Sequence, residues 1–339
     1  MNKVIVTGGA GYIGSHTCIK LIELGYEPLI IDNLSNTSIE NIKGVESITN
    51  KKLKFYEIDC CSAKSLDMII KKENGIIGAI HFAAYKSIEE SLIKPEKYLD
   101  NNLKSLESLI DVMANNNLNN LIFSSSCTVY GSPDSLPVDE NAPFKKAESP
   151  YGKTKQLCEK IIEKSTLYSV CLRYFNPIGC HNSGLIGDRS ADKPANLVPI
   201  ICEVANGKRE KLIINGNDYN TKDGTCVRDY IHVEDLALAH INALEYCIKN
   251  KSKSIFNIGT GQGLSVAETV RVFEESNNIK VNLEYGPRRT GDIAEIYSDT
   301  KKSNKYLKWK AKKSISDALK SAWSWELNKT QMILISLLP

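Results

Sequence analysis

The chain has 339 residues, of which 42% are hydrophobic and 24% are charged, as in an ordinary globular protein with room for about two domains. The 43 Lys and Arg residues almost balance the 40 Asp and Glu residues, so the net charge of +3 gives no field that favours nucleic acid or an anionic membrane. The ten cysteines and five histidines show neither C-x-x-C pairs nor H-E-x-x-H spacing, so we expect free thiols and no metal.

The N-terminus leads directly into a predicted strand. The apolar run before the first glycine covers only residues 4–6, far short of the roughly 7 to 15 residues of a signal peptide core. The apolar tail at residues 332–339 is likewise shorter than the roughly 18 residues that span a bilayer, and the sequence leaves open whether it packs or frays. We therefore expect a cytoplasmic protein.

Strand and helix patterns alternate through the first half of the chain. Apolar and β-branched runs predict strands, and longer helix-like stretches separate several of them. Such alternation indicates an α/β fold with a doubly wound parallel sheet of the Rossmann type, in which ligands bind at the carboxyl ends of the strands. The predicted strands cover residues 3–7, 28–32, 53–58, 76–82, 121–126 and 170–175, and the helices include 14–24, 95–115 and 151–165.

The pattern changes after about residue 176. A loop-rich stretch with several Gly and Pro residues precedes a predicted helix near residues 197–206 and a series of short mixed elements. We therefore predict two domains, the Rossmann domain at 1–176 and a smaller mixed α/β domain at 177–339, which face each other across a cleft.

Gly8, Gly11 and Gly14 spell G-x-x-G-x-x-G between the first strand and the helix that follows. Glycines at this place allow a tight turn and a close approach of the backbone to a pyrophosphate, which the helix N-terminus attracts. Asp32 ends the second strand, where its carboxylate can accept hydrogen bonds from both ribose hydroxyls and repel a 2′-phosphate. The pattern predicts NAD rather than NADP. Asp59, at a later strand end, could hold the adenine amino group or cap the next helix.

Tyr151 and Lys155 are predicted one turn apart on a helix that starts at Pro150. Lowering a tyrosine pKa from about 10 to about 7 takes roughly 4 kcal/mol, which is the order that an ammonium about 4 Å away can supply in a partly screened site. The nicotinamide ring of NAD⁺ would add to the effect and yield a phenolate that removes a hydroxyl proton while hydride leaves. Alone, such a pair is commonly a half-buried Tyr and a surface Lys, so the prediction depends on the glycine turn and on Ser126 at a strand end. Ser124 is interpreted as a strand or turn residue.

These motifs resemble the extended short-chain dehydrogenase/reductase superfamily. Within it, residues 1 to about 325 are similar to the UDP-glucose (UDP-galactose) 4-epimerase family. The resemblance is carried by the segments at residues 6–16, 123–131, 173–177 and 224–232, the last of which reads G-T-C-V-R-D-Y-I-H.

The resemblance implies roles for individual residues. Catalysis would fall to Ser126, Tyr151 and Lys155. NAD would be lined by Gly8, Gly11, Tyr12, Ile13, Gly14, Asp32, Asn33, Asp59, Cys60, Phe82, Ala83, Ala84, Lys86, Asn101, Tyr151, Lys155 and Phe175. The UDP-sugar would be held by Ser126, Tyr151, Asn176, Asn196, Leu197, Arg228, Arg289 and Asp292.

The implied reaction removes hydride from C4 of the sugar to NAD⁺ and returns it to the other face of a 4-keto intermediate. This interconverts UDP-galactose and UDP-glucose in galactose metabolism, with no net redox change. The family pattern also implies a homodimer formed through helices of the first domain.

Two alternatives share the expected fold. A nucleotide-sugar 4,6-dehydratase typically carries an Asp-Glu pair after the strand-end hydroxyl, where this chain has Cys127 and Thr128. A non-catalytic NAD-sensing protein would have little need for the catalytic trio. The chain also departs from the family pattern. Asn215 stands where an aromatic residue often packs near the uracil, and Ile296 is intermediate in size at a position that decides between plain hexoses and N-acetylhexosamines.

Overall fold

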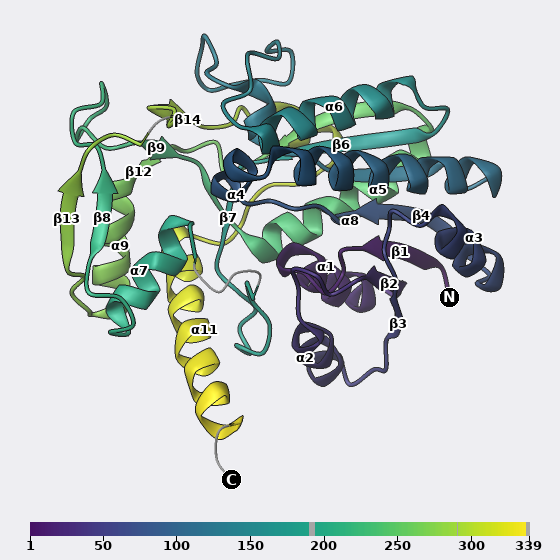
Figure 1. Cartoon of the computed structure of the whole chain (residues 1–339), viewed down its shortest axis with the longest axis horizontal. Helices are drawn as coiled ribbons and strands as arrows, with labels where there is room; N and C mark the ends of the chain where they lie inside the picture. Colours follow the sequence, from purple (N-terminus) through teal and green to yellow (C-terminus); the bar gives the residue numbers. More distant parts are fainter. Residues whose placement is uncertain (190–193, 290, 337–339) are drawn as a thin grey trace.

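The computed structural model describes residues 1–189, 194–289 and 291–336, with the side chains of residues 330–336 left out. A seven-stranded sheet runs through the larger part of the molecule, and helices cover both of its faces (Figure 1). Every neighbouring pair of its strands is parallel, which confirms the predicted doubly wound α/β fold. The spatial order is β11 (Lys253–Ile258), β6 (Tyr168–Tyr174), β5 (Asn120–Ser124), β4 (Ile76–His81), β1 (Lys3–Thr7), β2 (Glu27–Asp32) and β3 (Lys54–Glu57).

The strand order reverses direction at β1. The chain moves outward from β1 through β2 to β3 and then returns to β4 on the other side of β1. Crossover connections on the two sides leave a crevice above the carboxyl ends of β1 and β4, which is where open α/β sheets bind their ligands. The glycine turn lies at this point, between β1 and helix α1 (Tyr12–Glu23).

Side chains of the central strands alternate between two cores. Val4 and Val6 pack in one core with helices α1 and α8 (Val233–Asn250). Ile5 packs in the other core, with helices α3 (Ala63–Lys72), α5 (Pro95–Asn115) and α6 (Pro150–Lys164). All three side chains are fully buried, so each contributes about 1.5–3 kcal/mol to the hydrophobic stabilisation of the crevice floor. The helices around the sheet also include α2 (Ile39–Thr49), α4 (Ile88–Ile93) and the 3₁₀-helix η1 (Cys127–Tyr130).

A second, smaller core lies at the other end of the molecule (Figure 1). Here helices α7 (Leu197–Ala205), α9 (Val266–Asn277) and α11 (Ile315–Ser336) enclose the parallel pair β8 (Leu212–Asn215) and β13 (Leu283–Gly286). Two further small sheets consist of short strands. They are β7 (Asn176–Ile178) with β10 (Tyr230–His232), and β12 (Leu264–Ser265), β9 (Val227–Arg228) and β14 (Glu295–Ile296); helix α10 covers Lys301–Tyr306.

The structure refines the limits of the predicted elements. The fifth strand ends at Ser124, two residues earlier than expected, so Ser126 lies in the loop that leads into η1. The sheet takes its last strand, β11, from beyond residue 176, and the division into domains at that residue stays a prediction. The backbone at residues 332–336 continues α11, whereas residues 337–339 of the apolar tail lie outside the described residues.

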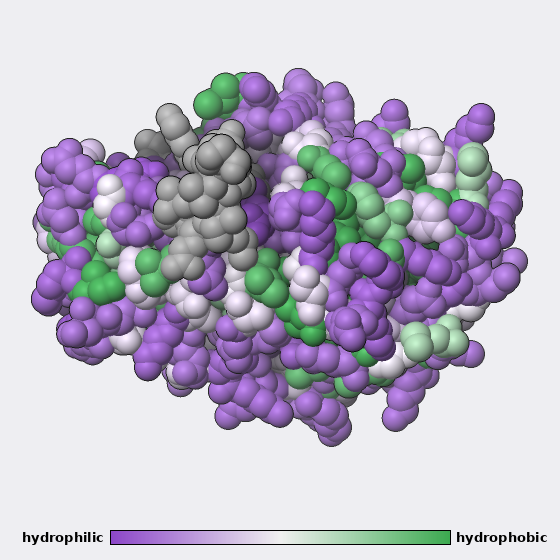
Figure 2. All heavy atoms as spheres, turned by 90° about the horizontal axis from the view of Figure 1, so that it is seen from below, coloured by the Kyte–Doolittle hydropathy of each residue, from purple (hydrophilic) through white to green (hydrophobic). Residues whose placement is uncertain are grey.

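All ten cysteines are free thiols, and eight of them are buried. Within the described ranges, no three His, Cys, Asp or Glu side chains gather in a way that could hold a metal ion. None of the helices described is both long and apolar enough to cross a membrane. The face in Figure 2 is mostly hydrophilic, with hydrophobic residues in small groups among the polar ones.

Candidate active site

The glycine turn has no room for side chains at two of its positions. Gly8 has a φ of +70°, and a Cβ there would lie 2.7 Å from the backbone nitrogen of Ala83 on the neighbouring loop. A Cβ at Gly14 would lie 2.3 Å from the carbonyl oxygen of Gly8. No side chain caps α1 at Gly11, so the N–H groups of its first turn are free to meet an anion. This cradle fits a dinucleotide pyrophosphate.

Asp32 is held rigidly at the end of β2. Its Oδ2 accepts a hydrogen bond from Ala10 N at 3.1 Å, and its Oδ1 accepts from Leu34 N at 3.0 Å and from the Thr37 hydroxyl at 2.8 Å. The side chain is 5% exposed, and burial raises its pKa. A carboxylate has about four acceptor positions, so this geometry leaves capacity for a ribose hydroxyl.

Asp59 does not cap the helix that follows it. Ser62 is the N-cap of α3 and accepts from Ser65 N, whereas Asp59 Oδ1 accepts from Cys61 N at 2.8 Å. Asp59 lines the same cavity as Asp32.

One cavity collects nearly all of the residues predicted to line the cofactor. Its empty volume, including the part that opens to solvent, is about 920 Å³. Of the predicted set, Phe175 lies outside the lining, in a buried cluster with Val129, Tyr130, Val138 and Ile296. The predicted residues in the lining are Gly8, Gly11, Tyr12, Ile13, Gly14, Asp32, Asn33, Asp59, Cys60, Phe82, Ala83, Ala84, Lys86, Asn101, Tyr151 and Lys155.

Several residues of the lining were not predicted from the sequence. Most of them adjoin residues that were predicted, so strand-end position was the available signal. The loop after Asp32 contributes three, and Tyr174 immediately precedes Phe175 in the R-Y-F-N-P segment. The missed residues are Ser35, Asn36, Thr37, Tyr85, Ser105, Ser124 and Tyr174.

Helix α6 places Tyr151 and Lys155 at the wall of this cavity. Ser149 caps the helix by accepting from Gly152 N at 3.1 Å, and Pro150 occupies its first turn. Both functional side chains are buried, and Lys155 Nζ lies 5.8 Å from the centroid of the Tyr151 ring. The ammonium donates to the carbonyl oxygen of Ser124 at 2.6 Å, which fixes it at the end of β5.

In the protein alone, burial disfavours the charged form of both groups at this wall. Burial is the main effect on both residues: it lowers the pKa of Lys155 to about 8 and raises the pKa of Tyr151 well above 10. A hydrogen bond from Ser126 opposes the rise at Tyr151. The expected phenolate at neutral pH therefore needs a further positive charge next to the ring.

Ser126 reaches Tyr151 from the loop after β5 rather than from the strand. It is 6% exposed and is the N-cap of η1, with its Oγ accepting from Thr128 N at 3.3 Å. Cys127, next along η1, has its thiol pKa raised to about 12 by burial. The Thr128 Oγ1 is buried without a hydrogen-bond partner. Neither residue can serve as the acid/base pair of a 4,6-dehydratase.

The structure brings three of the predicted sugar-nucleotide residues together. Asp292 lies between two arginines: its Oδ1 is 2.8 Å from Arg289 Nη2 and 3.8 Å from Arg228 Nη2. Asp229, next to Arg228, is fully buried and accepts from residues of the 260–261 and 298 loops, so it fixes the strand that carries Arg228. Sequence reasoning assigned no role to this aspartate.

The remaining predicted sugar-nucleotide residues come from other elements. Asn176 starts β7, and its backbone N–H donates to the carbonyl oxygen of Asp229 at 2.9 Å. Asn196 is the exposed N-cap of α7, and Leu197 is the first residue of that helix. Ile296 is buried and pairs with Arg228 in the β14–β9 ladder, whereas Asn215 is exposed at the end of β8.

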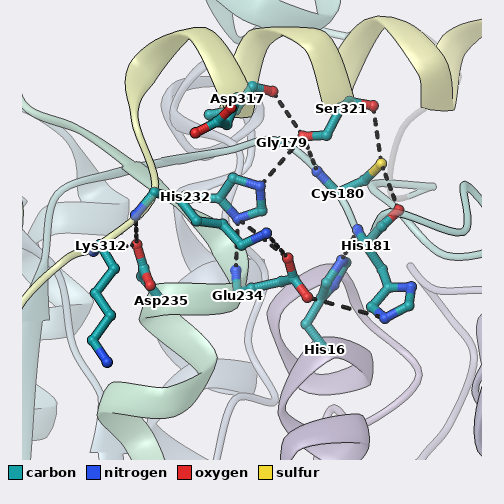
Figure 3. Close-up of polar contacts among 12 residues, drawn as sticks. His16, Gly179, Cys180, His181, His232, Glu234, Asp235, Lys312, Asp317 and Ser321 are labelled. Atoms are coloured by element: carbon teal, nitrogen blue, oxygen red, sulfur yellow. Dashed lines mark hydrogen bonds and ion pairs between the residues drawn. The ribbon is translucent and has the colours of Figure 1, made fainter.

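A buried polar network joins the glycine-turn helix to the second core (Figure 3). His16 Nε2 accepts from His181 N at 3.0 Å, and its Nδ1 lies 2.7 Å from the carbonyl oxygen of Tyr12. Tyr12 in turn donates to the carbonyl oxygen of Gly179. On the other side His232 Nε2 lies 3.3 Å from Ser321 Oγ on α11. The network fixes the cofactor helix relative to the elements that carry the predicted sugar-nucleotide residues.

The fold and this site define an extended short-chain dehydrogenase/reductase. A family model described as GDP-mannose 4,6 dehydratase matches residues 5–322, which places the chain in this broad class. Among individual proteins, the chain is 45% identical to a UDP-glucose 4-epimerase of Dictyostelium discoideum over 331 residues, 96% of each protein. It is 44% identical to the Bacillus subtilis UDP-glucose 4-epimerase over 328 residues, 95% of this chain and 96% of the relative.

Solved structures agree with these relatives. A UDP-glucose 4-epimerase of Stenotrophomonas maltophila, with bound NAD and formylated UDP-arabinopyranose, superposes with a TM-score of 0.95 at 37% identity, over 98% of this chain and 100% of that one. The enzyme of Bifidobacterium longum, in complex with NAD⁺ and UDP, gives a TM-score of 0.91 at 40% identity, over 97% and 99% of the two chains. The chain belongs to the UDP-glucose 4-epimerase family, whose members are NAD-dependent isomerases.

Proposed function

We propose that this protein interconverts UDP-galactose and UDP-glucose in galactose metabolism, through a transient 4-keto sugar and on an NAD that stays bound. The observation that carries the proposal is the meeting of Ser126, Tyr151 and Lys155 beside the dinucleotide cavity. The epimerase relatives, which match nearly the full chain, support the same reaction.

The residues in the cavity fit NAD. The glycine turn would hold the pyrophosphate, and Asp32 would accept from the ribose. Lys86 places a cation 5.8 Å from the ring centroid of Tyr12 in the same cavity. Phe175 would act from behind the lining, and the other lining residues would make the NAD contacts that the resemblance implies. When bound, NAD supplies a hydride acceptor and a positive ring, and it returns the hydride later.

Tyr151 is the proposed base and acid. It takes the proton of the sugar 4-hydroxyl, directly or through the hydroxyl of Ser126, and returns it when C4 is reduced on the other face. Lys155 is mostly protonated at pH 7 because its pKa is about 8, so it stabilises the phenolate without taking part in the proton transfer. All three side chains are buried in the protein.

Arg228 and Arg289 are the proposed ligands of the UDP diphosphate. Their forked cationic donors match phosphate oxygens, and their shared partner Asp292 keeps them oriented before the substrate arrives. Asn176, Asn196 and Leu197 would hold the rest of the UDP-sugar. The exposed Asn215 offers no aromatic face to the uracil, so we expect a modest uridine affinity.

We further propose a cytoplasmic homodimer. The ten free thiols favour a reducing compartment. Three apolar side chains of α4, those of Ile88, Leu92 and Ile93, are exposed beside α5 and α6, and a second copy would cover them. Light scattering of the purified protein should give twice the chain mass of 37.7 kDa, and a monomer would contradict this part of the proposal.

The reaction is tested by incubating the purified protein, without added NAD, with UDP-galactose and separately with UDP-N-acetylgalactosamine. We expect UDP-glucose from the first substrate, and the second shows whether Ile296 admits an acetamido group. A 4-keto-6-deoxy sugar would indicate a dehydratase instead. No product from either substrate would favour a non-catalytic NAD-binding protein.

A further inference from the structure

The loop that follows β7 returns to the glycine-turn helix and runs beside α1 and α2 (Figure 1). At its start, Gly179 accepts a hydrogen bond from the Tyr12 hydroxyl, and the backbone N–H of His181 donates to His16 Nε2 at 3.0 Å (Figure 3). Residues 184–188 continue from there and are called the strap below. The structure describes all five of them, and they lie outside the lining of the cofactor cavity.

Helix α2 holds the middle of the strap through a glycine. Ile186 is fully buried in the same core as Ile42 and Val45 of α2. A Cβ at Gly44 would lie 2.5 Å from Ile186 Cγ2 and 2.7 Å from the carbonyl oxygen of Leu185. Glycine is unfavourable inside a helix, but here it lets the strap lie directly against the helix backbone.

Asn41, on the same helix, joins the strap to the glycine turn. Its side chain is 1% exposed, and its Nδ2 donates to the carbonyl oxygen of Gly187 at 3.2 Å and to that of Ala10 at 3.0 Å. Ala10 belongs to the glycine turn, and its N–H donates to Asp32 Oδ2 at 3.1 Å. A single buried amide therefore connects the strap with the turn and, through the turn, with the aspartate proposed to bind the ribose.

Lys86 binds the far end of the strap. Asp188 Oδ2 accepts a hydrogen bond from Lys86 Nζ at 3.0 Å, and Lys86 lines the cofactor cavity. The two side chains are 22% and 40% exposed, so this ion pair lies where the cavity opens to solvent. The strap is thus fixed at one end by a buried amide and at the other end by a partly exposed ion pair.

The strand order shows what the strap spans. Asn41 follows β2, the glycine turn follows β1, and Lys86 follows β4, and β1 lies between the other two strands. A segment that is bound to both Asn41 and Lys86 therefore spans the glycine turn, which is the part of the crevice that fits a pyrophosphate. Opening the crevice at this point requires that the strap come away from Asn41 or from Lys86.

We propose that Asn41 and Asp188 are positioning residues for the resident cofactor: they hold the strap across the glycine turn, and the strap slows the release of NAD. This inference rests on the proposed function, because it takes the cavity to hold one NAD through many turnovers. The 4-keto sugar can be reduced only while the cofactor stays in place, so slow release protects each turnover.

The decisive variant is Asn41→Ala, which removes the amide between the strap and the turn. The purified holoenzyme is mixed with an excess of isotope-labelled NAD, and exchange of the bound cofactor is followed by mass spectrometry after denaturation. Exchange should be about tenfold faster than in the wild type, as expected for loss of a buried hydrogen bond. Activity lost on dialysis should return when NAD is added, with kcat and KM for UDP-galactose unchanged at saturating NAD.

The matched control is Asn242→Ala on α8. The Asn242 Nδ2 also donates to the carbonyl oxygen of a distant residue, Leu307, at 3.1 Å, and Asn242 lies outside the cavity lining. This variant loses a similar hydrogen bond without touching the strap. Its NAD should exchange at the wild-type rate.

Asp188→Asn tests the other end of the strap and also serves if Asn41→Ala does not fold. Exchange of NAD should be about two- to fivefold faster, because a partly exposed ion pair contributes little. The control is Asp218→Asn, which removes an exposed ion pair with Arg288 at 2.7 Å and should leave the exchange rate unchanged.

The exchange rates and the activity separate this inference from the proposed function. A wild-type exchange rate in folded Asn41→Ala and Asp188→Asn, or the same acceleration in Asn242→Ala, overturns the role of the strap. An active wild type with either result contradicts this inference alone. A wild type without bound NAD contradicts the proposed function and this inference together. A wild type that holds NAD but does not epimerise contradicts the proposed reaction, and the exchange rates still decide on the strap.

Discussion

The cofactor cavity and the sugar-nucleotide residues are built in different ways. The cavity is formed at the carboxyl edge of one sheet, mainly by strand ends and the loops that follow them. Apart from Ser126 and Tyr151, the predicted sugar-nucleotide residues instead come from β7, the start of α7, β9 and the loop that carries Arg289 and Asp292, which are separate segments of the second half of the chain.

The polar groups of the two regions differ as well. Asp32 is 5% exposed and is fixed by three hydrogen bonds from its own turn and loop. Arg289 keeps 44% of its side chain exposed and pairs with Asp292, a partner that a diphosphate must compete with. A rigid, backbone-built site suits a group that stays bound, and side-chain ion pairs suit a ligand that exchanges at each turnover.

The largest effect should come from Tyr151→Phe, which leaves both regions intact and removes the proposed base. We expect turnover of UDP-galactose to fall by about 10²–10⁴-fold, the usual contribution of general acid–base catalysis. NAD content, measured by chromatography after denaturation, should match the wild type. Near-normal turnover would contradict the mechanism.

Changes on the sugar-nucleotide side should affect substrate binding alone. Arg228→Leu removes a proposed charged donor to the diphosphate, so KM for UDP-galactose should rise about 10- to 100-fold, as for loss of a hydrogen bond to a charged group. The control is Arg209→Leu, which removes a surface arginine paired with Glu203. If Arg228→Leu also released NAD, the two regions would not be separable.

Acid should weaken the network that joins the two regions. Burial lowers the pKa of His16 to about 3 in the folded protein, against 6.5 when unfolded, so the unfolded chain binds more protons as the pH falls below 6.5. The contribution of His16 to the free energy of unfolding is therefore fully present above pH 6.5 and decreases as the pH falls toward 3. Between about pH 7 and about pH 5 this one group lowers the free energy of unfolding by about 2 kcal/mol. Urea unfolding gives the free energy of unfolding at the two pH values. In His16→Gln this free energy should fall by about 2 kcal/mol less than in the wild type. An equal loss in both proteins would show that His16 does not titrate as described.

The smallest effect is expected for Asp32→Asn on the cofactor side. The amide can still accept from the loop but is a weaker acceptor for ribose hydroxyls, so NAD should dissociate about tenfold faster, a change worth about 1.4 kcal/mol. Dialysis followed by quantification of the retained NAD measures this rate. KM for UDP-galactose should not change. A change in KM would show that the cofactor region also affects substrate binding, so that the two regions do not act separately.

The cofactor region was predictable because its signals are local in the sequence. Buried strands, the glycine turn and strand-end residues such as Asp32 follow one another along the first half of the chain, and the fold confirms their arrangement. Ser126 was selected from its place in the motif. Its position in a loop was not predicted, because a residue just beyond a short strand has the same local pattern as a strand residue.

The features that the sequence did not indicate depend on long-range pairing. The strand β11 joins the sheet from 253–258, the ion pairs of Asp292 link residues 228 and 289, and the contact between Ser124 and His240 spans 116 positions. Neither spacing nor periodicity carries such information. Burial also raises the pKa of Tyr151 well above 10, so the ammonium of Lys155, the electrostatic partner that the sequence supplied, is not sufficient by itself.

In the proposed reaction, the hydrogen that leaves C4 of the sugar returns to the same carbon without exchange with solvent. The most direct test uses UDP-galactose deuterated at C4, with purified protein in ordinary water and no added NAD. The account predicts UDP-glucose that retains the deuterium at C4. Loss of the label to solvent, or its absence from the product sugar, would contradict it.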